Sequence, residues 1–235
     1  MEIEAKYRVP DRRIFEVLLR LPSLGDVALI PSPGLEYQHN TYYDTPDRRL
    51  TAQRASLRIR ESGGTRVATL KYSRGGSGAI HIRDEWEATI GAEPHPSAWP
   101  DSSTRAQALH IVAGAPLVAL FTIQNRRYRI GLVRNSAVIG ELSLDEGHIQ
   151  AGGRILGFRE LEIELSHDGA PDDLVRLGAL LAHCFGLSPE PRGKRSRGVA
   201  LLRELTAEAE QSDSSTAQHL MRVVGLPQAT AAHCR

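Results

Sequence analysis

Carboxylate and ammonium side chains alternate with apolar residues at the start of the chain, in a spacing that can support chemistry. Glu2, Glu4 and Lys6 are separated by single apolar residues. Alternate side chains of a β-strand point to the same face, so the two carboxylates and the ammonium group would lie together there. Much later in the chain, the same spacing returns with three glutamates, Glu160, Glu162 and Glu164. Like charges on one face repel one another unless a cation lies against them.

Other strand-like segments carry basic side chains at the same spacing. Arg58 and Arg60 alternate with leucine and isoleucine, and Arg83 precedes Glu85 and Glu87 with the same period. Carboxylate clusters without nearby His or Cys are typical of Mg²⁺ or Mn²⁺ sites, where substrate phosphate often completes the coordination. One guanidinium group can donate two parallel hydrogen bonds to two oxygens of the same phosphate. A fold that gathers these faces around one space would suit phosphoryl transfer.

The alternative interpretation is the ordinary solvent-exposed face of an antiparallel sheet, held by weak cross-strand ion pairs. Periodicity alone leaves both interpretations open. Two observations favour a binding site. Solvent-exposed faces usually mix in Thr, Ser and Gln, whereas these positions are mostly Glu and Arg. The two signs are also segregated, because the first and last predicted strands are acidic and the third and sixth are basic.

Composition narrows the functional class. The 235 residues include 29 Lys and Arg against 28 Asp and Glu, a formal net charge of +1, which argues against a broad basic surface for duplex nucleic acid. The two cysteines, Cys184 and Cys234, have neither metal-ligand nor redox spacing. The sequence has no basic-then-apolar leader and no long apolar run. We therefore expect a reduced cytoplasmic protein that does not act on membranes.

Hydrophobic periodicity and turn residues predict about eight strands, at 2–9, 38–43, 55–61, 66–73, 79–90, 118–134, 137–147 and 155–166. Helices are predicted from Pro10, near 103–113, over 172–185 with Gly186 as the stop, and from Val199 to about Glu210. Eight antiparallel strands can close a barrel. We therefore predict an α+β fold, an eight-stranded antiparallel β-barrel or tunnel with a charged interior, covered outside by helices. Residues 1–204 would form this domain, and 205–235 the end of the last helix and a flexible tail.

Strand parity predicts which side chains face the interior. The expected inward set is Glu2, Glu4, Lys6, Arg58, Arg60, Thr69, Lys71, Arg83, Glu85, Glu87, Arg127, Arg129, Glu141, Ser143, Asp145, Glu162 and Glu164.

An ordered set of motifs along residues 1–204 resembles the CYTH superfamily, the triphosphate tunnel metalloenzymes. Glu2-x-Glu4-x-Lys6 is the family's defining motif and is short by itself; the order of the whole set makes the resemblance specific. The other matching segments are Tyr42-Tyr43-Asp44-Thr45-Pro46-Asp47 with Leu50, Leu57-Arg58-Ile59-Arg60, Thr69-Leu70-Lys71, Glu85-x-Glu87, Arg126-Arg127-Tyr128-Arg129, Leu144-Asp145-Glu146-Gly147, Glu160-x-Glu162-x-Glu164-Leu165, and Lys194 near Arg197.

The resemblance implies a tunnel open at both ends that binds a triphosphate group and one or two Mg²⁺ or Mn²⁺ ions. By position, the implied metal ligands are Glu2, Glu4, Asp145, Glu162 and Glu164. The implied catalytic residues are Lys6, Glu85 and Glu87, the two glutamates binding metal or orienting water. The implied triphosphate-binding residues are Lys6, Arg58, Arg60, Lys71, Arg127, Arg129, Lys194 and Arg197, with parity selecting Arg127 and Arg129 from their arginine cluster.

The resemblance further implies hydrolysis of the terminal phosphoanhydride of a triphosphate, by a monomer or homodimer acting on a small molecule. Inorganic triphosphate is the expected substrate, because parity places Tyr72, Trp86 and Tyr128 outside the tunnel and leaves only Tyr42 unassigned. A class IV-type adenylyl cyclase, forming cyclic AMP from ATP, and a non-catalytic polyphosphate-binding module remain the alternatives.

Overall fold

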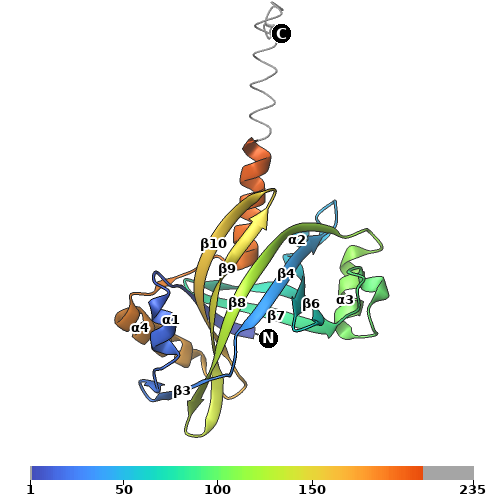
Figure 1. Ribbon diagram of the computed structural model, residues 1–235. Helices are drawn as coiled ribbons and strands as arrows, with labels where there is room; N and C mark the ends of the chain where they lie inside the picture. The colour runs from blue at the N-terminus through green and yellow to red at the C-terminus, as the bar shows by residue number, and fades with distance from the viewer. Residues whose placement is uncertain (1, 209–235) are drawn as a thin grey trace, which may run out of the picture.

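Eight long antiparallel strands close on themselves into a barrel in the computed structural model, which describes residues 2–208 (Figure 1). Around the wall the order is β1, β7, β6, β5, β4, β8, β9 and β10, and β10 pairs back with β1. Their bounds are β1 Glu2–Arg8, β4 Glu36–Asp44, β5 Ala55–Ser62, β6 Thr65–Ser77, β7 Ile80–Thr89, β8 Val118–Arg134, β9 Ala137–Ala151 and β10 Arg154–Leu165. The predicted fold class is confirmed.

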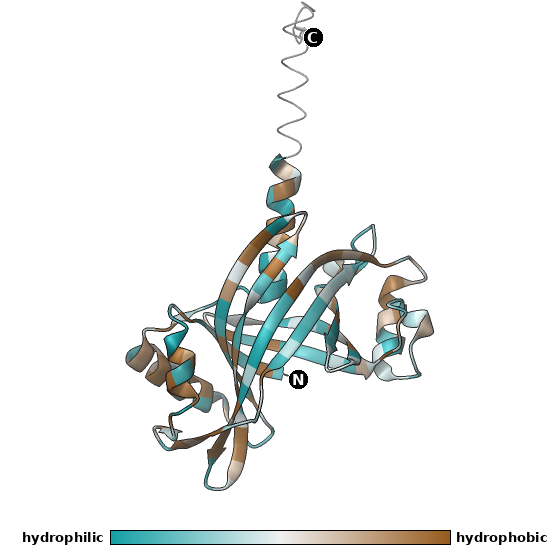
Figure 2. Ribbon diagram, viewed as in Figure 1, coloured by the Kyte–Doolittle hydropathy of each residue, from teal (hydrophilic) through white to brown (hydrophobic). Residues whose placement is uncertain are grey.

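Hydrophilic and hydrophobic residues both occur along each long strand (Figure 2), and because successive residues of a strand point to opposite faces, they are divided between the two faces of the wall. The register places Glu4 beside Glu164, Lys71 beside Glu85, and Arg127 beside Asp145, all on the inner face. The apolar residues between them point outward. The hydrophobic core of this protein therefore lies mainly outside the barrel, under the helices.

Two groups of helices cover the outer face. Helices α1 (Arg13–Leu18) and α4 (Pro171–Phe185) pack on one side, where Leu18, Leu142 and Leu181 are fully buried. Helices α2 (Arg49–Ala52) and α3 (Ser103–Val112) cover β5 and β6 on the other side. Gly186 ends α4 as predicted, with the left-handed φ of 62° that glycine adopts without strain.

The last helix enters one end of the barrel. Residues 194–208 are helical, and Leu201 packs with Phe121, Ile149 and Phe158, which lie on the inner face of β8, β9 and β10. Gly198 lies against Phe121 so closely that a Cβ atom would come within 2.4 Å of the ring. The last helix therefore packs against the inner face of the wall at this end of the barrel. That the tunnel is open at both ends stays a prediction.

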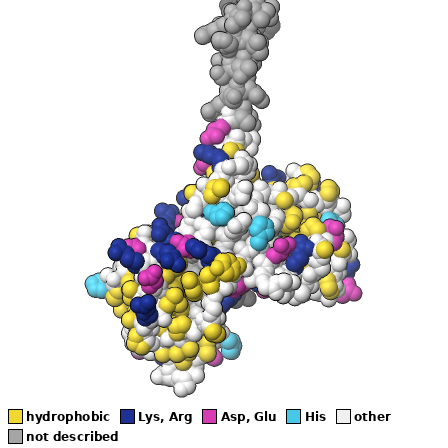
Figure 3. All heavy atoms as spheres, viewed as in Figure 1, with side chains coloured by type: hydrophobic (Ala, Val, Ile, Leu, Met, Phe, Trp, Pro, Cys, Tyr) yellow, Lys and Arg dark blue, Asp and Glu magenta, His cyan; other side chains and the backbone are white. Residues whose placement is uncertain are grey.

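Several short elements were not predicted. They are β2 Ser23–Leu24, β3 Val27–Pro31, α2, the 3₁₀ turn Pro96–Ala98 and β11 Ser188–Pro189. The last helix begins at Lys194, five residues before the predicted start, and the predicted tail from residue 209 onward lies outside the described residues. Within residues 2–208, no helix has the length and apolar character needed to cross a membrane. Acidic and basic side chains intermingle on the outer lobe that carries α1 and α4 (Figure 3).

Candidate active site

The barrel encloses a cavity of about 860 Å³ whose wall carries most of the predicted site residues. Ten basic and six acidic side chains line it: Lys6, Arg54, Arg58, Arg60, Lys71, Arg83, Arg127, Arg129, Lys194 and Arg195, with Glu2, Glu4, Glu85, Glu87, Glu162 and Glu164. Two predicted site residues, Asp145 and Arg197, lie behind this wall and do not line the cavity.

Carboxylates from the first and last barrel strands meet on one part of the wall. Glu4 of β1 and Glu164 of β10 are direct cross-strand partners, and Glu2 lies one step along the same face. Within the described residues, Glu164 has no Lys or Arg at ion-pair distance. Glu164 lines the cavity and is an exposed residue, but the partial burial of its carboxyl, followed by the charge of Glu2, raises its pKa to about 7.

This group has the donor atoms that a divalent cation binds, although among the described residues the carboxylates that already lie close enough to share an ion are Asp145, Glu160 and Glu162. Its donors are carboxylate oxygens, which Mg²⁺ and Mn²⁺ prefer, with no His or Cys among them. Burial is the main cause of the raised pKa of Glu164, and the charges of the neighbouring carboxylates, Glu2 first among them, add to it. A cation bound by Glu2, Glu4 and Glu164 would offset the repulsion among these carboxylates.

Basic side chains flank the acidic group and hold two of its members. Lys6 Nζ lies 2.7 Å from Glu4 and also pairs with Glu162, while Arg83 pairs with the second oxygen of Glu4. Lys71 Nζ bridges Glu2 at 2.9 Å and Glu85 at 2.6 Å. Glu2 and Glu4 are therefore positioned from both sides, by cations that also face the cavity.

The basic wall on β5 is much less neutralised. The guanidinium groups of Arg58 and Arg60 share one carboxylate, Glu87, whose Oε1 is 3.6 Å from each. Burial, followed by the charge of Arg58, lowers the pKa of Arg60. Glu87 also accepts a hydrogen bond of 2.7 Å from the Thr69 hydroxyl. Because, within residues 2–208, Arg58 and Arg60 have only the one carboxylate of Glu87 between them, their guanidinium groups are well suited to bind phosphate oxygens.

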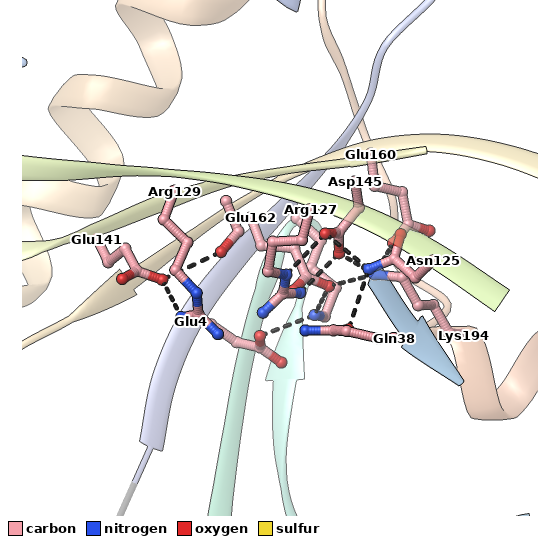
Figure 4. A network of polar contacts seen from close by, with 12 residues as sticks. Glu4, Gln38, Asn125, Arg127, Arg129, Glu141, Asp145, Glu160, Glu162 and Lys194 are labelled. Atoms are coloured by element: carbon pink, nitrogen blue, oxygen red, sulfur yellow. Dashed lines mark hydrogen bonds and ion pairs between the residues drawn. The ribbon is translucent and has the colours of Figure 1, made fainter. Parts of the chain in front are cut away.

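A buried carboxylate cluster surrounds Lys194, which the last helix brings to the cavity (Figure 4). Its Nζ lies 2.8 Å from Asp145, 2.6 Å from Glu160 and 2.8 Å from Glu162. These three carboxylates are close enough to one another to hold a metal ion. In this structure the ammonium group of Lys194 takes that position.

Asp145 is fully buried behind the wall and anchors two cations that reach the cavity. It accepts hydrogen bonds from Arg127 Nε at 2.7 Å and Nη2 at 2.6 Å, from Lys194, and from Asn125 at 2.9 Å. Burial by itself would raise the pKa of Asp145, but the charges of Arg127 and Lys194 lower it to about 2. In this structure Asp145 pairs with Arg127 and Lys194, and it also belongs to the carboxylate group, with Glu160 and Glu162, that lies close enough together to hold a metal ion. Its role as a metal ligand stays a prediction.

Arg197 and Arg129 also depart from the expected picture. Arg197 points to the buried carboxylate of Glu160 and lies over the Phe158 ring, so it faces away from the cavity. Arg129 lines the cavity, but Glu36 at 3.0 Å and Glu141 at 2.6 Å both hold its guanidinium. Parity predicted the inner face correctly, but it did not separate residues that reach the cavity from residues packed behind its lining.

Several cavity residues were missed. Gln38, Asn40 and Tyr42 line it from β4, and as uncharged residues they gave no signal in the charge pattern. Arg54 continues the inward parity of Arg58 and Arg60, so the spacing alone could have revealed it. Arg195 lies on the last helix, and its position depends on how that helix enters the barrel.

The fold and the cavity agree with what comparison with known proteins finds. The family model for the CYTH domain matches residues 1–189. An inorganic triphosphatase from Haemophilus influenzae is 28% identical over 146 residues, which are 59% of this chain and 40% of that protein. The chain thus spans about two fifths of the length of this curated relative.

Solved structures share the fold at low sequence identity. A candidate adenylyl cyclase from Hippeastrum, described as revealing a dominant triphosphatase activity, is 22% identical with a TM-score of 0.64, covering 86% of this chain and 97% of that one. A candidate adenylate cyclase from Bacillus halodurans is 23% identical with a TM-score of 0.57, covering 84% and 96%. The extent of the family match, with the closed barrel, shows that the chain belongs to the CYTH domain family.

Proposed function

We propose that this protein hydrolyses the terminal phosphoanhydride of a linear triphosphate, with inorganic triphosphate as a substrate and Mg²⁺ or Mn²⁺ as the cofactor. The observation that carries the proposal is the separation of charge inside one cavity. Glu164 lacks a cationic partner among the described residues, while Arg58 and Arg60 share one carboxylate on a different part of the wall. A metal–triphosphate complex would complement both groups at once.

Glu2, Glu4 and Glu164 would hold the metal ion, with Glu162 beside them. When bound, the ion would polarise phosphate oxygens and offset their negative charge. The phosphate chain would lie against the basic side chains of the cavity, which we propose to be Lys6, Arg58, Arg60, Lys71, Arg127, Arg129 and Lys194. Asp145 would keep Arg127 and Lys194 in place for this task.

Glu85 and Glu87 would act on the attacking water. Although burial raises the pKa of Glu87, its hydrogen bond with Thr69 and the charges of Arg60 and Arg58 lower it overall. Glu87 is therefore an ionised acceptor at neutral pH, able to orient a water molecule by accepting its proton in a hydrogen bond. Glu85 lies one step along the same strand face and is held by Lys71.

The aromatic residues of the barrel support a small inorganic substrate. Tyr72 and Trp86 pack edge to face on the outside of the wall, with ring centroids 5.6 Å apart. Tyr42 faces the cavity, but one side of its ring is stacked on Phe121 at 4.8 Å. A nucleoside needs an apolar slot and polar groups for its base, whereas a bare triphosphate needs only charge.

A panel of triphosphates tests the proposal. Inorganic triphosphate, ATP and thiamine triphosphate would each be incubated with Mg²⁺, Mn²⁺ or EDTA, and phosphate and cyclic AMP would be measured. We expect metal-dependent phosphate release, with the highest kcat/KM for inorganic triphosphate. Glu4→Gln and Glu164→Gln should abolish most of the turnover without unfolding the protein. Cyclic AMP with pyrophosphate would identify a cyclase instead, and tight binding without turnover would identify a binding module.

A further inference from the structure

Four arginines gather at the end of the cavity where the last helix begins. Arg54 and Arg195 line the cavity itself. Arg195 Nη2 donates a hydrogen bond of 3.0 Å to the Thr51 hydroxyl of α2, and α2 is flanked by Arg48 and Arg54. Arg203 lies just over two helical turns beyond Arg195, near enough for its charge to act on Arg195. We call Arg48, Arg54, Arg195 and Arg203 the arginine mouth.

The arginine mouth lacks counter-charges. Within residues 2–208, no carboxylate lies at ion-pair distance from any of its members, whereas each of the other eight basic side chains of the cavity has at least one. Asp44 is near, but it is fully buried and accepts its bonds from Leu50 and Thr51. Burial lowers the pKa of Arg195; Asp44 and Tyr42 oppose this shift, while the charges of Arg203 and Arg48 add to it, so the arginines repel one another.

A polar track joins the arginine mouth to the proposed triphosphate site. Along the inner face of β5 the order is Arg60, Arg58 and Ser56, and Arg54 comes directly before the strand, with a left-handed φ of 54°. Ser73 continues the face of β6 beyond Lys71, and Ser56 lies about 7 Å along β5 from Arg58. The track offers hydroxyl and guanidinium donors, and the glutamates of the cavity lie on other strands. Hydroxyl and guanidinium groups are donors that bind phosphate oxygens. Counted from Arg58 and Arg60, this track is longer than a chain of three phosphates.

We propose that the arginine mouth binds phosphate groups beyond the third, so that this protein binds linear polyphosphates longer than triphosphate more tightly than triphosphate itself. The inference rests on the proposed function, because it assumes that the first three phosphates occupy the metal-side part of the cavity. A chain of phosphates would relieve the repulsion among the arginines and could run from Arg58 along Ser56 to Arg54 and Arg195.

Binding in EDTA, measured by calorimetry, tests this without turnover. The probes are inorganic triphosphate and a medium-chain linear polyphosphate, with the wild type and the double variant Arg54→Gln, Arg195→Gln. The wild type should prefer the longer chain by at least about tenfold, as expected for the gain of one or two charge-assisted contacts. The double variant should lose most of this preference, while its affinity for triphosphate falls by a smaller factor.

The matched control is Arg20→Gln, Arg159→Gln, which removes the same charge from two exposed arginines on the outside of the protein. It should keep the wild-type preference. A second double variant, Arg48→Gln, Arg203→Gln, changes only exposed positions and should weaken binding of the longer chain selectively. The inference is overturned if the preference is absent from the wild type, survives in the double variant, or is lost equally in the control.

A triphosphorylated oligoribonucleotide is the other polyanion to compare. In one outcome, the oligoribonucleotide binds more tightly than triphosphate and loses this advantage in the Arg54→Gln, Arg195→Gln variant. If polyphosphate then shows no such behaviour, the arginine mouth binds nucleic-acid phosphates and the inference is wrong. The two proposals fail separately. Absence of metal-dependent phosphate release from triphosphate would refute the proposed hydrolase, while the EDTA binding measurements would still decide the role of the arginine mouth.

Discussion

Asp145→Asn is the sharpest test of how the interior charges are held. The Asp145 carboxylate has no solvent exposure and accepts four hydrogen bonds, two from Arg127 and one each from Lys194 and Asn125. Asparagine has nearly the same shape but no charge, and it would turn an NH₂ group toward donors. The substitution therefore removes one of the two carboxylates that Arg127 and Lys194 share, the other being Glu162, and it does so at a fully buried position.

The size of the effect follows from the pKa. Asp145 titrates near 2 in the folded protein and near 3.8 ordinarily, a difference of about two units, or roughly 2–3 kcal/mol of stabilisation by the charged form. Breaking a buried ion pair by removing one partner costs about 3–5 kcal/mol in other proteins. We expect Asp145→Asn to lower the free energy of unfolding by about 3 kcal/mol at pH 7.

The pH dependence has a definite sign. A carboxyl whose pKa is lowered by folding contributes stability above its unfolded pKa, and loses it as the pH falls through the folded pKa. In urea unfolding with EDTA, the difference in the free energy of unfolding between wild type and Asp145→Asn should therefore be constant above about pH 4. Between about pH 4 and pH 2 this difference should shrink, because only the wild type loses the contribution of the Asp145 carboxylate.

The control is Asp101→Asn. Asp101 also pairs with an arginine, Arg105, at 2.6 Å, but its side chain is 95% exposed, whereas that of Asp145 is 0% exposed. Exposed pairs contribute about 1 kcal/mol or less. Equal losses in the two variants, or a gap for Asp145→Asn that does not change with pH, would refute the claim that burial makes this pair strong.

Three further outcomes are expected. Because the pKa of Glu164 is about 7, its carboxyl is mostly protonated at pH 6, and Mn²⁺ binding at that pH should release a proton. Calorimetry in buffers of different ionisation enthalpy measures this release. Glu164→Gln should abolish it, and an unchanged release would place the titrating group elsewhere. Gly178→Ala would put a Cβ 1.9 Å from the Tyr7 hydroxyl and should destabilise the protein by about 1–3 kcal/mol in urea unfolding. Gly91→Ala, with nothing within 4 Å, is its control and should be nearly neutral. Arg60→Ala should weaken triphosphate binding by about 1.5–3 kcal/mol in calorimetry. If it lowers the melting temperature and leaves affinity intact, Arg60 serves the ion pair with Glu87 and not the ligand.

The barrel could be predicted because its strands alternate strictly over long stretches. A segment such as 55–62 has one charged and one apolar face, and this assigns its orientation without knowledge of its neighbours. The turn residues between such segments then gave the number of strands. By contrast, β3 has five residues and β2 and β11 two each, too few for a period to be recognised.

The site was harder to predict, because facing inward is not the same as reaching the cavity. Glu160, Glu162 and Glu164 share one face of β10, yet Glu160 is fully buried, Glu162 lines the cavity among cations, and Glu164 lacks a basic partner within residues 2–208. What separates them is the last helix, whose Lys194 and Arg197 bind the first two carboxylates. The alternation of residues within β10 cannot predict this difference, since it depends on contacts with a helix that begins about thirty residues later in the chain.

The unequal pairing inside the barrel argues against a purely structural interior. If the charges served only to hold the strands together, Glu164 would be expected to pair with one of the ten cavity cations, and Arg58 and Arg60 would not share a single carboxylate. The strand order keeps Glu164 apart from Arg58 and Arg60, because β1 and β10 are separated from β5 by β6 and β7 on one side of the wall and by β9, β8 and β4 on the other. Rigid strands thus keep an acidic group and a basic group apart at a cost in stability, and a bound metal–phosphate complex would recover that cost.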